Sequence, residues 1–300
     1  MKHEIRMALL CLATVAVPAF AQDSSPRCGS TNFDTSRGLF TVINPAAEAV
    51  NQQCFLTVYP RGAMPSEAKL SPASYTVEGS YTIELSGGGG GGGGGVSRDQ
   101  GGGGGGAGAA PSRTVQHLSP GLYKLTLGTG GDGGGANGGW TWPGNPTSIT
   151  HAYTGQLVAG YSGADVWIQR ALPSSDGRGG VARAGESAGG SGGDSGKQSE
   201  EPAQAGGYSP SGYAGRPGQS GSESGRSVQT NAGRVVQSNA GGGGGASMGS
   251  GGAGESVGGN RPAGTGDLGG GGGGGRGGLR SSDSGGLGGH GFVRLTMTPG

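Results

Sequence analysis

The stretch from Leu85 to Pro111 reads LSGGGGGGGGGVSRDQGGGGGGAGAAP, and it decides what kind of fold the chain has. Nine glycines run from Gly87 to Gly95, and six more run from Gly101 to Gly106. In isolation such runs are flexible coils. However, the alternating pattern of residues 81–85, YTIEL, is typical of a strand and leads directly into the first run. The stretch is therefore either a linker or a structural material.

The order of strand patterns and glycine runs favours the second interpretation. Another β pattern, residues 122–127, follows these runs, and residues 291–298 again alternate apolar and polar side chains. The glycine tracts 241–245 and 269–275 lie shortly before that last pattern. We therefore predict one domain with glycine built into it. The alternative is a β domain with a disordered tail, and residues 176–240 have the composition of disorder.

Glycine can serve as scaffold because it adopts the extended helix with three residues per turn that proline also forms. A glycine helix keeps its N–H groups and has no side chains, so neighbouring helices can approach closely and hydrogen-bond sideways. Fixing each glycine costs about 1–2 kcal/mol of backbone entropy or more, so only a cooperative lattice closed by strands can persist. Collagen is excluded because it needs glycine at every third residue and abundant proline. The sequence predicts a mainly β fold with polyglycine-type helices capped by β-strands.

The first 21 residues have the features of a secretory signal peptide. Lys2 and Arg6 give a positive start, residues 7–17 are apolar, and Ala19-Phe20-Ala21 is a cleavage site of small residues. We therefore expect an exported protein that is extracellular or attached to a cell surface, with no membrane insertion.

The expected domain layout follows from this signal peptide and from the glycine runs. Residues 1–21 are the signal peptide, residues 22–86 an N-terminal β unit, and residues 87–300 the glycine-rich domain, in which 176–240 is the segment expected to be disordered.

Charge and cysteine content restrict the partners and the compartment. Cleavage after Ala21 would leave 20 − 2 = 18 basic and 19 − 1 = 18 acidic residues, a balance that argues against nucleic acid or anionic lipid as partners. Cys28 and Cys54 would be the remaining pair, and a disulfide between them is expected in an oxidising compartment. It would contribute roughly 3 kcal/mol. Two unpaired buried thiols are the alternative.

Serine motifs do not amount to a catalytic site. Residues 185–189 and 245–249 both match G-x-S-x-G, but neither lies between a strand and a helix, as a nucleophile elbow requires. Residues 193–196, GDSG, lie in a low-complexity context. A lone match to a calcium-binding nonapeptide, residues 189–194, lacks the repeats that such sites need. We predict a protein without enzymatic activity, cofactor or metal.

Aromatic residues give the remaining functional signal. Trp140 and Trp142 flank Thr141 and precede Pro143-Gly144-Asn145-Pro146, which reads as a turn at an end of the glycine domain. Exposed aromatic side chains often anchor ligands. The sequence therefore predicts Trp140, Trp142 and Tyr153 as ligand-binding residues. The alternative is that the tryptophans supply a scarce apolar core.

The order of motifs resembles the glycine-rich domain of phage tail-fibre adhesins and of related secreted bacterial proteins. The resemblance rests on "YTIELSGGGGGGGGG", "LSPGLYKLTLGTGGDGGG", "NPTSI" and the ending Gly289–Leu295. It implies a sandwich of packed glycine helices with binding loops at a tip. We expect a non-catalytic structural or adhesive surface protein that contacts cell-surface or matrix components, glycans among them, or its own copies. The alternative is an extracellular carbohydrate- or ice-binding module.

Overall fold

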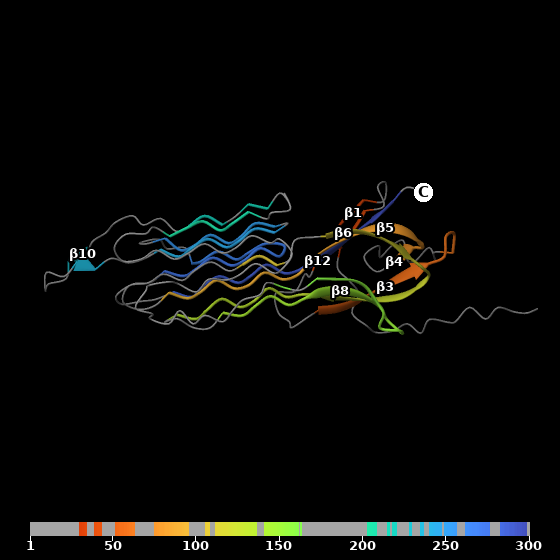
Figure 1. Cartoon of the computed structure of the whole chain (residues 1–300), viewed down its shortest axis with the longest axis horizontal. Helices are drawn as coiled ribbons and strands as arrows, with labels where there is room; N and C mark the ends of the chain where they lie inside the picture. Colours follow the sequence, from red (N-terminus) through yellow and green to blue (C-terminus); the bar gives the residue numbers. More distant parts are fainter. Residues whose placement is uncertain are drawn as a thin grey trace, which may run out of the picture.

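The molecule is elongated, with β-strands at one end and extended glycine segments at the other (Figure 1). The described residues contain no α-helix, and none of their segments is a helix that could cross a bilayer. The computed structural model describes residues 30–34, 39–43, 52–63, 75–95, 106–108, 112–136, 141–161, 163, 203–208, 215–216, 218–220, 228–229, 235–236, 240–247, 249–256, 262–276 and 283–298.

Two five-stranded sheets form the β end. The first is antiparallel and has the order β1 (Ser30–Asp34), β2 (Leu39–Ile43), β12 (Phe292–Met297), β5 (Gly79–Ser86), β6 (Ser112–Leu118).

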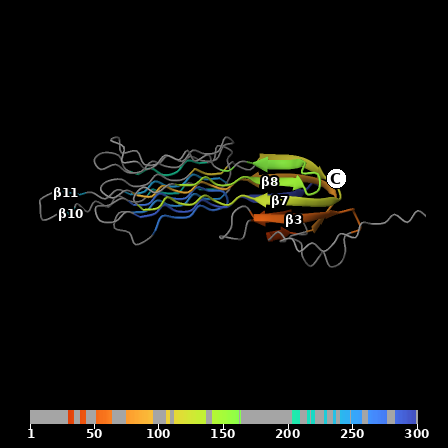
Figure 2. The ribbon, with the colours of Figure 1, turned by 90° about the horizontal axis from the view of Figure 1, so that it is seen from below.

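The second sheet has the order β4 (Tyr75–Val77), β3 (Gln52–Tyr59), β7 (Gly121–Leu127), β8 (Thr147–His151), β9 (Leu157–Tyr161). Its strands are antiparallel except that β3 and β4 run parallel. The two-residue strands β10 (Val228–Gln229) and β11 (Val235–Val236) pair with each other at the far end of the molecule (Figures 1 and 2).

One apolar core joins the two sheets into a sandwich. Alternate residues of β5, β12, β3 and β7 point inward, as the period of two in their sequences predicts. The buried side chains are Cys54, Leu56, Val58, Tyr81, Ile83, Leu85, Leu118, Tyr123, Leu125, Leu127, Ile149, Val293 and Leu295.

The last strand lies in the same sheet as two strands from the first third of the chain. Strand β12 lies between β2 and β5, with Val293 opposite Val42 on one side and Leu85 on the other. The expected boundary at residue 86 falls where β5 passes into the first glycine run, and the sandwich takes strands from both sides of it. Glycine-rich segments thus lie within the fold, between strands that share one core.

Hydrogen bonds show the conformation of the glycine segments. The N–H groups of Gly89, Gly92 and Gly95 donate to the carbonyls of Gly289, Gly286 and Asp283, at 2.8–2.9 Å. A donor every third residue toward one neighbour means three residues per turn, which is the repeat of the polyproline-type helix. We call such segments glycine helices. Adjacent glycine helices run either parallel or antiparallel to one another, and all of these helices extend away from the sandwich (Figures 1 and 2).

The helix at residues 269–276 is enclosed on all sides. Hydrogen bonds join it to six segments of the described chain. These are residues 87–95, 106–108, 240–247, 249–256, 262–267 and 283–291. This is hexagonal packing, in which successive residues donate in different directions. The polyglycine-type helices that the sequence predicts are therefore present.

Close approach explains why the inner positions are glycine. A Cβ on Gly91 would fall on the carbonyl oxygen of Asp132, and one on Gly272 would fall on that of Gly286. Gly135, by contrast, has open space where its Cβ would point. Glycine is required where a helix faces another helix and is dispensable where it faces solvent.

The strands expected at residues 81–85, 122–127 and 291–298 are β5, β7 and β12, with small differences at their ends. Strands β1, β6 and β8 were missed. The signal peptide and Cys28 lie outside the described residues. Cys54 is buried in the core, and the Cys28–Cys54 disulfide stays a prediction.

Parts of the segment 176–240 are described by the structure and lie in the glycine lattice. Residues 203–208, 215–216 and 218–220 contribute to the glycine lattice, since the N–H of Gly206 donates to Gly218 and that of Ala246 to Gly207. These pieces have few large apolar side chains. A glycine helix needs few such side chains, because its stability comes from backbone hydrogen bonds.

Candidate functional site

Trp142 lies on an outer helix of the lattice, residues 141–146. Its N–H donates to the carbonyl of Asp132 and its own carbonyl accepts from Gly91, both at 3.1 Å. Thr141 and Gly144 face inward, as the three-residue repeat requires. The Trp142 side chain is 56% exposed on a backbone held from two sides.

The prediction of a turn at residues 143–146 was wrong. The segment is a straight member of the lattice, because the proline, glycine and asparagine that favour turns are equally compatible with the extended three-fold helix. Pro143 and Pro146 lie at exposed positions, where a missing N–H leaves no lattice hydrogen bond unmade. Trp142 nevertheless faces solvent, as expected. Trp140 lies outside the described residues.

Tyr153 lies in a different place, in the turn between β8 and β9. It is 72% exposed, and its ring is 6.2 Å from that of His151, which in turn packs edge-on against Tyr123 at 5.4 Å. Strand β8 separates this turn from Trp142, so at the rise of extended chain the two aromatic residues are about 30 Å apart. The structure therefore does not bring Trp142 and Tyr153 into one site.

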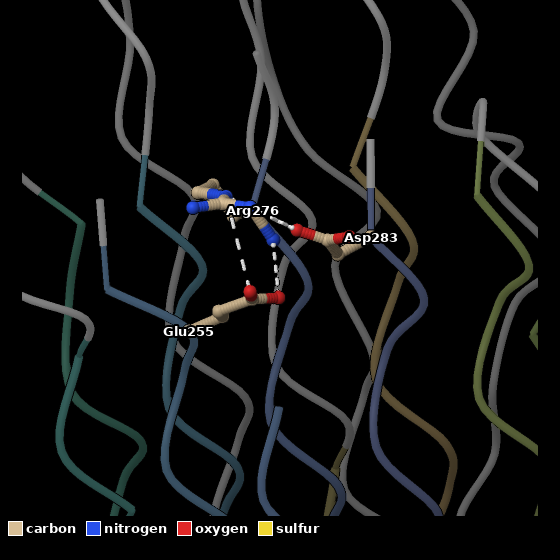
Figure 3. Close-up of polar contacts among 3 residues, drawn as sticks. All are labelled: Glu255, Arg276 and Asp283. Carbon is tan, nitrogen blue, oxygen red and sulfur yellow. Dashed lines mark hydrogen bonds and ion pairs between the residues drawn. The ribbon is translucent and has the colours of Figure 1, made fainter. Parts of the chain in front are cut away.

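A charged cluster that the sequence analysis missed lies at the distal end of the lattice, the end away from the sandwich. Glu255, Arg276 and Asp283 come from three adjacent glycine helices and point toward one another (Figure 3). The Arg276 guanidinium donates to Asp283 Oδ2 from Nη2 at 2.7 Å and from Nε at 3.1 Å. The Arg276 backbone N–H donates to Glu255 Oε2 at 3.2 Å, and Nε lies 3.8 Å from Glu255 Oε1.

Burial dominates the electrostatics of this cluster. Glu255 is 5% exposed, and loss of hydration raises the pKa of its carboxyl above 4.5. The hydrogen bond from the Arg276 backbone lowers that pKa, whereas the neighbouring Asp283 carboxyl raises it further, and the net direction is upward. The sequence signal that could have found the cluster is one ionisable residue directly after a glycine-rich stretch, as at Arg276 after residues 269–275 and at Glu255 after residues 251–254.

A second ionisable group lies where the lattice meets the sandwich. Nδ1 of His290 accepts a hydrogen bond from the N–H of Gly130 at 3.1 Å, which requires Nδ1 to be unprotonated. Burial lowers the pKa of the imidazole below 6.5. Other polar groups also lie where the lattice meets the sandwich. The N–H of Gly128 donates to Thr147 Oγ1 at 3.0 Å, and the hydroxyl oxygens of Ser86 and Ser247 are 3.2 Å apart.

We expect His290 to make the protein less stable as the pH falls below about 6.5. The unfolded chain then binds a proton at His290 that the folded chain resists, so the free energy of unfolding falls by at most about 1.4 kcal/mol per pH unit from this group. Thermal unfolding between pH 7.5 and 5.5 measures the effect. His290→Asn keeps an acceptor but cannot titrate, and it should remove this part of the pH dependence. An unchanged dependence in His290→Asn would contradict the assignment.

The geometry defines a class of protein: a β-sandwich whose strands continue into a hexagonal lattice of glycine helices. The family model described as glycine-rich domain matches residues 70–298. The chain therefore belongs to the glycine-rich domain family. Comparison with curated proteins finds no match.

Proposed function

We propose that the protein is an exported, non-catalytic structural or adhesive protein of the cell surface or extracellular matrix, in which the glycine lattice is a stiff projection from the sandwich. The observation that carries the proposal is the three-residue hydrogen-bond repeat, which ties each glycine helix to several neighbours. Such a lattice bends little, because bending would break hydrogen bonds in several directions at once. A stiff projection suits a protein that must hold a binding surface away from its point of attachment.

The exposed face of the 141–146 helix is the proposed ligand surface. Trp142 offers a large aromatic side chain whose backbone is already fixed, so little conformational entropy is lost on binding. Weak contacts of this kind become effective when many copies engage one surface.

A carbohydrate ligand is the second candidate function, and the neighbour of Trp142 favours it. Asp132, on the adjacent glycine helix, is exposed and is joined to Trp142 through its backbone carbonyl. An aromatic face packs against the C–H groups of a sugar ring, and a carboxylate accepts hydrogen bonds from its hydroxyls. Asp132 and Trp142 place these two groups on neighbouring helices.

We expect Trp142→Ala to weaken adhesion by about tenfold or more while changing the free energy of unfolding by less than about 1 kcal/mol. The side chain projects into solvent, so its loss removes contact area and leaves the lattice intact. Retention of the protein on immobilised cellulose, chitin and protein-coated surfaces measures adhesion, and thermal unfolding measures stability.

Tyr208→Ala is the matched control, because Tyr208 is also an aromatic residue of an outer glycine helix and is 72% exposed. It should leave adhesion unchanged. Equal losses for both variants would show unspecific stickiness and contradict a surface at Trp142. Asp132→Asn separates the two candidates: it should weaken retention on the polysaccharides alone if sugar is the ligand. No retention of the parent protein on any surface would count against adhesion itself.

A further inference from the structure

Glu255, Arg276 and Asp283 lie side by side at the end of the lattice that is farthest from the sandwich. Each is at the distal end of its glycine helix, in 249–256, 270–276 and 283–291 respectively. Their backbones are also in register there: Glu255 N–H donates to Gly274, and Asp283 N–H donates to the carbonyl of Arg276 at 3.0 Å. The side-chain cluster therefore fastens three helices at the distal end of their described residues (Figure 3).

The charges of the cluster do not balance when every group is ionised. Two carboxylates share one guanidinium, which leaves a net charge of −1 beside the buried Glu255. An uncompensated buried charge is costly. A single proton on either carboxyl removes the excess charge and allows the two carboxyl groups to share a hydrogen bond, so the protonated cluster is the tighter one.

No other described ionisable group compensates this charge. The helices 240–247 and 87–95 contact Glu255 and Asp283 through Gly241 and Gly95, and they carry no ionisable side chain in their described residues. Arg216, Asp267 and Asp132 lie on the other neighbouring helices. The backbones of Arg216 and Asp267 hydrogen-bond at Gly251 and Ser250, and Asp132 lies two residues before Gly134, whose carbonyl accepts from Gly285. Gly251 and Ser250 are four and five residues before Glu255. At about 3.1 Å per residue, they are on the order of 12–16 Å from Glu255 along the helix axis.

We propose that the Glu255–Arg276–Asp283 cluster is a pH-dependent lock, which holds the distal ends of three glycine helices together in mild acid and loosens them at higher pH. The sign follows from the charge count. The lock is fully closed when the cluster holds one extra proton, and its contribution is lost as the pH rises and that proton leaves. His290, at the other end of the 283–291 helix, responds in the opposite direction. The proposal does not depend on the adhesive function.

Amide hydrogen exchange on the full exported chain, between pH 5 and pH 8, tests the lock. The reporter amides are those of Glu255 and Arg276, and the reference amides are Gly218 and Ala246, which also bond within the lattice and lie away from His290. After correction for the intrinsic pH dependence of exchange, protection at the reporters should fall about tenfold or more relative to the references, the ratio that one pKa unit gives. Equal protection at both pH values would overturn the proposal.

Two conservative variants identify the source of the response. Glu255→Gln and Asp283→Asn each remove one titrating carboxyl and keep an acceptor for Arg276, so either change should keep reporter protection at its acid level up to pH 8. Both variants preserve side-chain size, and their protection at the reference amides reports whether they are folded. A fall in reporter protection in both variants as large as in the parent chain would show that the response comes from elsewhere and refute the lock.

Discussion

Replacing Gly91 with valine is expected to lower the free energy of unfolding by about 3–5 kcal/mol. The new side chain would begin on the carbonyl oxygen of Asp132, so the 87–95 and 128–136 helices must move apart. Overpacking of this kind costs about 1–3 kcal/mol, and the bonds from Gly91 to Trp142 and from Gly131 to Gly89 would weaken at about 1 kcal/mol each. Thermal or denaturant unfolding of the protein measures the change.

Gly135→Val is the matched control for this experiment. Gly135 lies in one of the same two helices but has open space where its Cβ would point. Its variant should unfold within about 0.5 kcal/mol of the parent protein. If Gly91→Val behaved like Gly135→Val, the glycine run would be a linker. Gly103, in the second run, lies outside the described residues.

Leu125→Ala is the second change with a large expected effect, a loss of about 2–5 kcal/mol. Leu125 is fully buried on β7, between the two sheets, and its removal leaves a cavity in the only large apolar core of the described residues. Because β7 continues directly into the 128–136 helix, the glycine lattice should lose stability together with the sandwich. Global unfolding and hydrogen exchange at the lattice amide of Asn145 measure the two parts.

The exposed Val115→Ala on β6 provides a control that removes apolar atoms without opening a cavity, and it should change stability little. Independent behaviour of the two parts would contradict their coupling. In that case Leu125→Ala would unfold the sandwich while Asn145 kept its full protection.

Local pattern was enough to predict the parts of the fold that repeat with a period of two. Residues 81–85 and 292–297 alternate clearly, and both are strands that bury their apolar face. Strand β8, TSITH, was missed because its buried face consists of Thr147 and Ile149, and only Ile149 is apolar. The glycine helices were predictable as a type, since the runs are interrupted by strands that must share a core.

Position within the lattice was not predictable, because it depends on which helix lies beside which. The sequence around Glu255 does not indicate that Arg276 and Asp283 are its neighbours in space. The register of three glycine helices brings these residues together. The segment at Trp142 shows the same limit. Its prolines and glycine fit a turn or an extended helix equally well, and the hydrogen bonds to Asp132 and Gly91 decide between them.

The central place of β12 has a consequence for biogenesis. Residues 292–297 form the seam between β2 and β5, strands that are synthesised some 200 residues or more earlier. Neither partner can complete its sheet before this late strand arrives, so the nascent chain stays open during synthesis. Contacts so distant along the chain make folding slow, so this sheet closes only after nearly all of the chain has been synthesised.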